Sequence, residues 1–206
     1  MKRLLKVGAM ALGLAFLAAP LHAEDYVELA APQPTGDPSK IEVVEMFSYA
    51  CPHCYHFDPQ LHTWIAAQAK DVTFISIPVV FRPTWEPLAR AYFVAEMLGV
   101  LDKLHGALFK ALHEEKQTLE TEDAVAKVFV AQGVDEKQFR DAYNSFSVAA
   151  KLNRAKQMTV KYGINGVPTL VINGKYRTSA SEAGSAEGML KAADRLIAQE
   201  RAARKP

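Results

Sequence analysis

Hydrophobic and polar positions along the chain predict a strand, a helix and a second strand near the start of the fold. Residues 41–47 are almost continuously apolar, as expected for a central strand covered on both faces. Residues 52–69 carry apolar side chains at helical spacing, and residues 71–77 alternate before Pro78. One helix between two strands predicts a parallel pair joined by a right-handed crossover.

A long helical tract follows and shows no strand signal. Its pattern predicts five helices, over residues 86–98, 101–115, 121–132, 135–146 and 148–162. Thr121 is the expected N-cap of the third helix, and Gly133 lies just past its end. Because strand signals resume after this tract, we interpret it as an insertion into one domain rather than a second independent domain.

The C-terminal part predicts a hairpin and a last helix. Residues 169–172 form a strand, Asn173-Gly174 is a strong signal for a tight hairpin turn, and a partner strand starts at Lys175. The last helix begins near Ser185. Ahead of the first long strand, residues 26–29 predict a short strand that leads into a proline-rich connection.

Residues 1–23 are typical of a signal peptide, with a basic start, an apolar core and a cleavage site expected after Ala23. Removing them leaves 183 of the 206 residues, enough for one domain with an insertion. The leader holds three of the 24 basic residues, so 21 Lys and Arg remain against 23 Asp and Glu. A net charge near −2 offers no basic field for nucleic acid, so we expect no nucleic-acid partner.

The candidate chemistry lies in Cys51-Pro52-His53-Cys54, which holds the only two cysteines of the sequence. The motif follows the first long strand and opens the helix, where unpaired N–H groups favour a thiolate. Cys51 is therefore the expected nucleophile, Cys54 the buried partner one turn later, and His53 a polar group that stabilises the Cys51 thiolate. Two cysteines so close together make a poor structural staple, so we predict a redox dithiol.

Two acidic residues lie near the dithiol in the sequence, Glu45 before it and Asp58 after it. Glu45 shares a strand face with Val43 and Phe47. Either the strand end bends and Glu45 reaches water, or Glu45 is a desolvated acid that exchanges protons with Cys54. Asp58 lies on the helix after the dithiol and is expected to be a solvated helix residue.

The remaining side chains of interest give weaker signals. We expect no metal site, because two thiolates fill only half of a tetrahedral site and the histidines are scattered. These histidines are His56, His62, His105 and His113. Four aromatic residues, two of them after the second strand and two in the first helix of the tract, are expected to be core rather than client-binding surface. They are Phe81, Trp85, Tyr92 and Phe93.

Two segments stand out for their specific sequences: residues 45–55, with Cys-Pro-His-Cys at their centre, and Gly166-Val167-Pro168 followed by Asn173-Gly174-Lys175-Tyr176. Together they resemble the DsbA family of periplasmic thiol:disulfide interchange proteins. The resemblance implies an α/β protein with the thioredoxin fold, a central mixed β-sheet flanked by helices, carrying an inserted all-helical domain. The thioredoxin-like domain would span residues 24–84 and 163–206, and the insertion residues 85–162.

The resemblance also implies how the site works. Cys51 would be the exposed sulfur that substrate thiols attack and that carries the mixed disulfide, and Cys54 would be the buried, resolving partner. Pro168 would follow a cis peptide bond and lie against the dithiol, where the Val167 backbone can pair with an extended client. The implied function is a periplasmic oxidase, without a cofactor, that donates its disulfide to newly exported proteins. A quinone-linked membrane partner of the DsbB type would reoxidise it.

Two alternatives stay open at this point. A reductase or isomerase would keep Cys51 reduced, although no stretch of the sequence predicts the separate dimerisation domain that isomerases often carry, and we expect a monomer. A periplasmic chaperone or metal-binding module would use the same scaffold without turnover. Replacing Cys51 with Ser separates these alternatives, because only the enzyme would lose its main activity.

Overall fold

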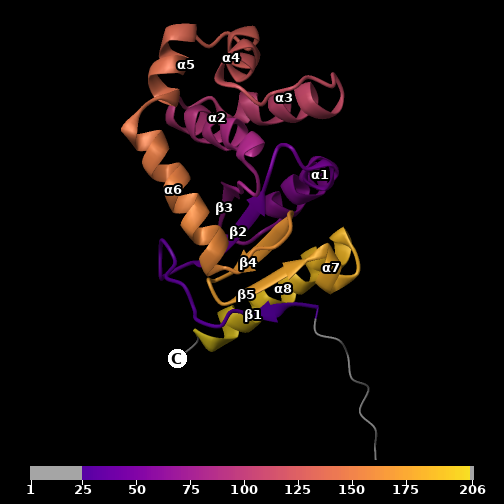
Figure 1. The fold of residues 1–206 in the computed structure, drawn as a ribbon. Coiled ribbons are helices and arrows are strands. Elements are labelled where there is room, and N and C mark those ends of the chain that lie inside the picture. The colour runs from indigo at the N-terminus through magenta and orange to yellow at the C-terminus, as the bar shows by residue number, and fades with distance from the viewer. Residues whose placement is uncertain (1–24, 205–206) are drawn as a thin grey trace, which may run out of the picture.

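The computed structural model describes residues 25–204, so the expected signal peptide lies outside the described residues. A mixed sheet of five strands lies at the centre, in the order β1-β5-β4-β2-β3 (Figure 1). The strands are β1 (Val27–Glu28), β2 (Ile41–Phe47), β3 (Val72–Pro78), β4 (Thr169–Ile172) and β5 (Tyr176–Ser179). β2 and β3 are parallel, as predicted, and the other neighbours are antiparallel.

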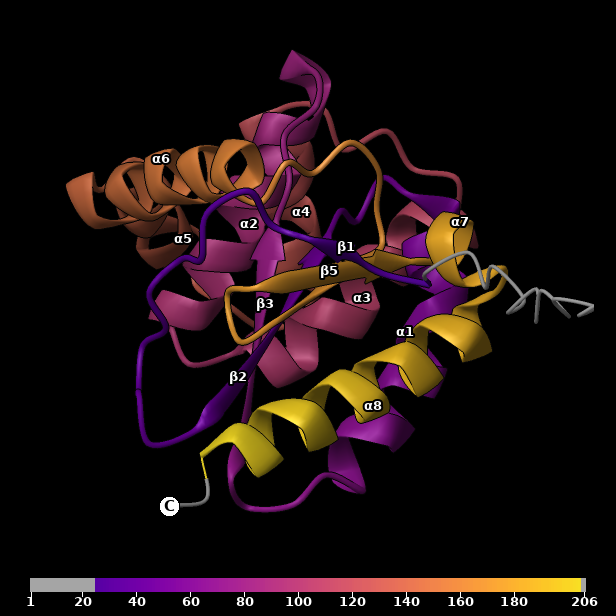
Figure 2. The same ribbon diagram turned by 90° about the horizontal axis from the view of Figure 1, so that it is seen from below.

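Helices cover both faces of the sheet, and every residue of β2 is buried. On one face, Ile41 and Val43 belong to a core shared with α1 (Pro52–Ala66) and α8 (Ala186–Ala203), which lie beside each other in Figure 2. On the other face, Val44 and Met46 pack into a larger core with the remaining long helices. The prediction of a central strand buried on both sides is confirmed.

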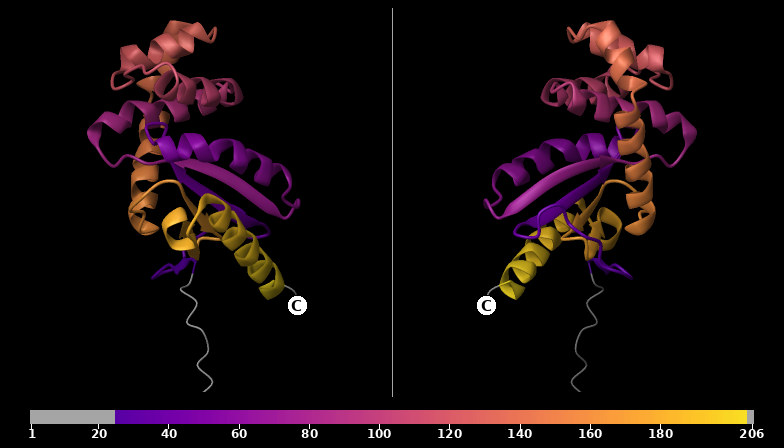
Figure 3. Two further views of the ribbon diagram at one scale, coloured as in Figure 1. Left: turned by 90° about the vertical axis from the view of Figure 1, so that its right-hand side faces the viewer. Right: turned by 90° about the vertical axis from the view of Figure 1, so that its left-hand side faces the viewer.

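Five helices between β3 and β4 gather beyond one end of the sheet, and the last of them runs back along it (Figure 3). They are α2 (Glu86–Met97), α3 (Leu101–His113), α4 (Glu122–Ala131), α5 (Glu136–Tyr143) and α6 (Phe146–Lys161). A single buried cluster connects Val44 of β2 with Leu108 of α3 and Phe139 of α5. The division of the chain at residues 85 and 162 stays a prediction.

Helix ends follow their capping residues. Thr121 caps α4 as predicted, because its Oγ1 accepts the Ala124 N–H at 3.2 Å. The predicted break near residue 147 is wrong: Ser145 Oγ accepts the Val148 N–H at 3.2 Å, so Phe146 begins α6 instead of ending the helix before it. The short helices η1 (Pro83–Trp85) and α7 (Ala180–Ala183) were not predicted.

The aromatic residues around the start of α2 divide between core and surface. Tyr92 and Phe93 are buried, as expected. Phe81 is 42 % exposed and contacts Trp85 with ring centroids 5.7 Å apart, so the expectation of a core position is wrong for Phe81. Within residues 25–204, no helix is both long and apolar enough to cross a membrane.

The predicted hairpin turn fixes the end of β4 against the proline-rich connection. Asn173 and Gly174 both have positive φ, 51° and 63°, and the Lys175 N–H donates to the Ile172 carbonyl at 3.0 Å. The Gln33 N–H donates to the Gly174 carbonyl at 2.8 Å. A Cβ at Gly174 would collide with the Gln33 carbonyl oxygen, so both the backbone angle and the close approach require glycine here.

Candidate active site

Cys51 occupies the N-cap position of α1, four residues after β2 ends. Pro52 follows in the first turn, where its fixed φ suits the helix and its missing N–H leaves no donor unpaired. The Cys51 N–H donates to the Ser48 carbonyl, and the Cys51 carbonyl accepts the Tyr55 N–H, both at 3.1 Å. Both cysteines are free thiols, and Cys54 is fully buried, as expected. Cys51 is only 8 % exposed, so the expectation of an exposed sulfur is wrong, because the Val167 carbonyl lies against it.

The two thiols have opposite acidity. A hydrogen bond from the Cys54 thiol is the largest cause that lowers the pKa of Cys51 to about 6, with help from the Cys54 and His53 N–H groups and the His53 charge. Burial is the largest cause that raises the pKa of Cys54 far above its ordinary value, followed by the hydrogen bond with Cys51 and the charges of Cys51 and Glu45. Only Cys51 is therefore a thiolate at neutral pH.

The loop before β4 brings Val167 and Pro168 to this sulfur. The Val167–Pro168 peptide bond is cis, and Cys51 Sγ lies 3.3 Å from the Val167 carbonyl oxygen, to which Cys51 donates when it is protonated. Thr169 Oγ1 donates to the Gly166 carbonyl at 2.8 Å and closes the turn. Cys51 and Val167 are more than 100 residues apart in the chain and meet at the site, as the resemblance implied.

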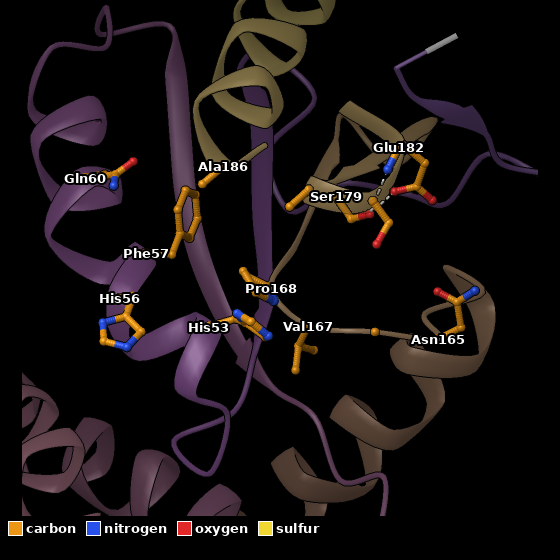
Figure 4. Close-up of a pocket in the computed structure, with 13 residues that line it drawn as sticks. His53, His56, Phe57, Gln60, Asn165, Val167, Pro168, Ser179, Glu182 and Ala186 are labelled. Atoms are coloured by element: carbon orange, nitrogen blue, oxygen red, sulfur yellow. Dashed lines mark hydrogen bonds between the residues drawn. The ribbon is translucent and has the colours of Figure 1, made fainter. Parts of the chain in front are cut away.

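A groove of about 700 Å³ opens beside His53, which belongs to the Cys-Pro-His-Cys motif (Figure 4). His53, Phe57 and Gln60 line it from α1, and Val167 and Pro168 line it from the opposing loop. The far wall is formed by residues from the end of β5 and from α7, together with Ala186 at the start of α8. The exposed imidazole of His53 thus stands next to Val167 and Pro168 at the mouth of the groove (Figure 4).

Glu45 is buried, so the alternative in which it reaches water is wrong. Its side chain is 3 % exposed and accepts a hydrogen bond from Ser76 Oγ on β3 at 2.8 Å. Burial is the largest cause that raises the pKa of Glu45 to about 7, against the opposing effect of the Ser76 hydrogen bond. The carboxyl is also close enough for its charge to raise the pKa of Cys54.

Asp58 is not the solvated residue that the sequence suggested. Its side chain is 20 % exposed, and one oxygen lies 2.9 Å from His105 Nε2 and 3.4 Å from His62 Nε2. The other ring nitrogen of His105 lies 2.9 Å from the Tyr49 hydroxyl. Asp58 and His62 are four residues apart, a spacing that places two side chains on the same face of a helix. No local pattern in the sequence indicates that His105 of α3 joins them.

Comparison with known proteins fits this geometry. The DSBA-like thioredoxin domain family model matches residues 42–194. The chain belongs to this family. It is 42 % identical to the thiol:disulfide interchange protein DsbA of Pseudomonas aeruginosa, over 88 % of this chain and 86 % of that one. It is 39 % identical to the DsbA of Burkholderia cepacia, over 97 % of each chain.

Solved DsbA structures have the same fold. The crystal structure of Pseudomonas aeruginosa DsbA matches with a TM-score of 0.85 at 42 % identity, covering 89 % of this chain and 95 % of that chain. The predicted thioredoxin fold is confirmed, and the protein is a DsbA-like thiol:disulfide oxidoreductase. Its family membership argues against a scaffold without turnover.

Proposed function

We propose that the protein is a disulfide donor that oxidises cysteine pairs in exported proteins. The observation that carries this proposal is the unequal acidity of the two thiols, with the pKa of Cys51 lowered to about 6 and that of Cys54 raised. A thiolate that the fold stabilises makes reduction of the Cys51–Cys54 disulfide more favourable. The disulfide is then the stronger oxidant.

The size of this effect follows from the pKa of Cys51. Lowering it from an ordinary 9.0 to about 6 stabilises the reduced protein at pH 7 by about 1 kcal/mol. For a two-electron couple, about 1 kcal/mol corresponds to about 20 mV of higher reduction potential. The thiolate of Cys51 alone therefore moves the couple in the oxidising direction.

The proposed reaction passes through a mixed disulfide. A client thiolate attacks Cys51 Sγ, the Cys51–Cys54 bond breaks, and Cys54 leaves with the electron pair. A second client thiolate then attacks the client sulfur of the mixed disulfide and expels the Cys51 thiolate. The client gains a disulfide, and the two enzyme cysteines gain the two electrons.

Glu45 is the proposed proton donor in the first step. The leaving Cys54 sulfur is buried, and burial makes its thiolate unfavourable, so it needs a proton at once. A carboxyl group with a pKa of about 7 still holds a proton in about half of the molecules at pH 7. We assign the client to the groove, with its backbone paired to Val167 beside Pro168 and with Pro52 and His53 shaping the nucleophile.

Several further assignments belong to this proposal. We place the mature protein in the periplasm as a monomer, exported by the signal peptide and cleaved after Ala23. A quinone-linked membrane oxidase of the DsbB type would restore the disulfide, and no cofactor or nucleic acid would be needed. Residues 24–84 with 163–206 would form the thioredoxin-like domain, and residues 85–162 the inserted helical domain.

Disulfide transfer to a reduced peptide that contains two cysteines tests the proposal. We expect the oxidised protein to form one peptide disulfide for each protein disulfide lost, and Cys51→Ser to form none. Cys54→Ser, with Cys51 first converted to a mixed disulfide with a small aromatic thiol, should hold a peptide that has a single cysteine as a stable mixed disulfide, because neither Cys54 nor a second client thiol can resolve it. Thiol trapping in glutathione buffers gives the potential: a value near the roughly −270 mV of thioredoxins would refute the oxidase proposal.

A further inference from the structure

A second cluster of reactive side chains lies where α1 meets α3, and it contains neither cysteine. Asp58 and His62 come from successive turns of α1, and His105 comes from α3. One ligand atom from each of the three side chains can be chosen so that all lie within 4.8 Å of one another. Two imidazoles and one carboxylate at this spacing form a ligand set typical of divalent transition metals.

We propose that Asp58, His62 and His105 form a binding site for a divalent transition-metal ion such as Zn²⁺. The Nε2 atoms of both histidines point at the same carboxylate oxygen, at 2.9 Å and 3.4 Å. An ion between the three groups would be coordinated by one nitrogen of each imidazole ring and by one carboxylate oxygen of Asp58. The side chain of His62 is 65 % exposed, so solvent can enter and fill the remaining coordination positions.

The outer contacts of His105 hold its ring in the orientation that a ligand needs. The Nδ1 atom lies 2.9 Å from the Tyr49 hydroxyl, and Tyr49 is 1 % exposed. The ring also packs edge-on against Phe109, with centroids 5.1 Å apart. A hydrogen bond on one ring nitrogen that leaves the other free for the metal is the usual arrangement around metal-binding histidines.

There is also space beside the cluster. A cavity of about 80 Å³ is lined by all three proposed ligands and by Glu45 and Ser76. This volume is larger than the roughly 30 Å³ that one water molecule occupies in the liquid, so a metal-bound water fits without moving the backbone. The three ligands, the oriented ring and the adjoining cavity together distinguish the cluster from an ordinary ion pair.

The site would connect two parts of the fold. α1 begins at the dithiol, and α3 belongs to the helices that follow β3 in the chain. An ion bound to both helices would oppose their separation and would stabilise the folded protein in proportion to its concentration. At 100 times the dissociation constant, the ratio of folded to unfolded protein should rise about 100-fold.

Calorimetric titration of the untagged protein with Zn²⁺ tests the site. The protein is used with its disulfide closed, because free thiols would themselves bind Zn²⁺. We expect one equivalent to bind, and His62→Ala and Asp58→Asn each to weaken the affinity at least tenfold. His56→Ala removes a histidine of the same helix outside the cluster, and it should leave the affinity unchanged.

A second measurement guards against variants that fold poorly. Denaturant unfolding with and without Zn²⁺ should show stabilisation in the parent protein and in His56→Ala, and a much smaller one in His62→Ala. No heat and no stabilisation in the parent protein would overturn the proposal. Equal binding by the parent protein and His62→Ala would also overturn it, since the ion would then be held elsewhere. Neither result bears on disulfide transfer.

Discussion

The substitution Glu45→Gln tests whether burial makes ionisation of this carboxyl group unfavourable. Gln has nearly the same shape and can still accept the hydrogen bond that Ser76 Oγ donates at 2.8 Å, but it carries no charge. The folded-state pKa of Glu45 is raised from 4.5 to about 7, so the folded protein binds this proton more tightly than the unfolded chain. The parent protein must therefore lose stability as the pH rises from about 4.5 through about 7.

The magnitude follows from the same two pKa values. At pH 7 the unfolded chain is almost fully ionised at this position and the folded protein is half ionised, which costs the parent protein about 3 kcal/mol of unfolding free energy. Below pH 4 both states are protonated and the cost disappears. Glu45→Gln should thus be close to neutral at pH 4 and stabilising by about 3 kcal/mol at pH 7 to 8.

Urea unfolding between pH 4 and pH 8 measures this difference. The proteins are compared in the disulfide form, in which no thiol titrates. Glu120→Gln provides a control at an exposed glutamate, and its unfolding curves should follow those of the parent protein at each pH. A stability difference for Glu45→Gln that stays constant from pH 4 to pH 8 would refute the reasoning, because the carboxyl would then ionise equally well in both states.

Two further predictions concern the nucleophile and the hairpin. In the reduced protein, thiolate absorbance at 240 nm should rise with a midpoint near pH 6 from Cys51, with no second step from Cys54 below pH 9. The contribution of the Cys51 thiolate to the oxidising strength of the disulfide should vanish below pH 6. A single step near pH 9 would contradict the assigned acidity. Gly174→Ala should destabilise the protein by more than about 1 kcal/mol, because φ is positive at Gly174 and a Cβ there meets the Gln33 carbonyl. Gly106→Ala is the control in the middle of α3, where a Cβ meets nothing within 4 Å, and it should stabilise the protein by about 0.5–1 kcal/mol. Equal effects of the two substitutions in denaturant unfolding would contradict this account.

Local chemistry explains which elements the sequence predicts well. Thr121 and Ser185 each accept a backbone N–H at the start of a helix, and Asn173-Gly174 supplies two positive φ angles. These signals act over three or four residues and are readable without any tertiary context. The dithiol belongs to the same class, because the spacing that brings the Cys54 thiol to Cys51 and the N-cap position of Cys51 are both visible from the strand and helix patterns around them.

Contacts between distant segments explain what the sequence leaves open. The pattern around Glu45 is compatible with burial or with exposure, and the register of β2 and β3 decides, since Ser76 lies opposite Glu45 and donates to it. Asp58 has an ordinary helical surface spacing until α3 places His105 against it, 47 residues later in the chain. The break before Phe146 depends on Ser145, which caps the start of α6. Other small polar residues nearby could equally have capped this helix, so the sequence does not locate the break.

The contacts of α3 show why the helices after β3 belong to the redox site. His113 Nε2 lies 2.7 Å from the Tyr49 carbonyl, and its ring stacks on Tyr55 with centroids 4.9 Å apart. The Tyr55 hydroxyl donates to Glu114 at 2.7 Å. Tyr49 and Tyr55 flank Cys51 in the chain, so α3 holds both sides of the segment that presents the sulfur. The helical tract therefore positions the nucleophile that the sheet and α1 create, and substitutions in α3 should alter the site without touching a cysteine.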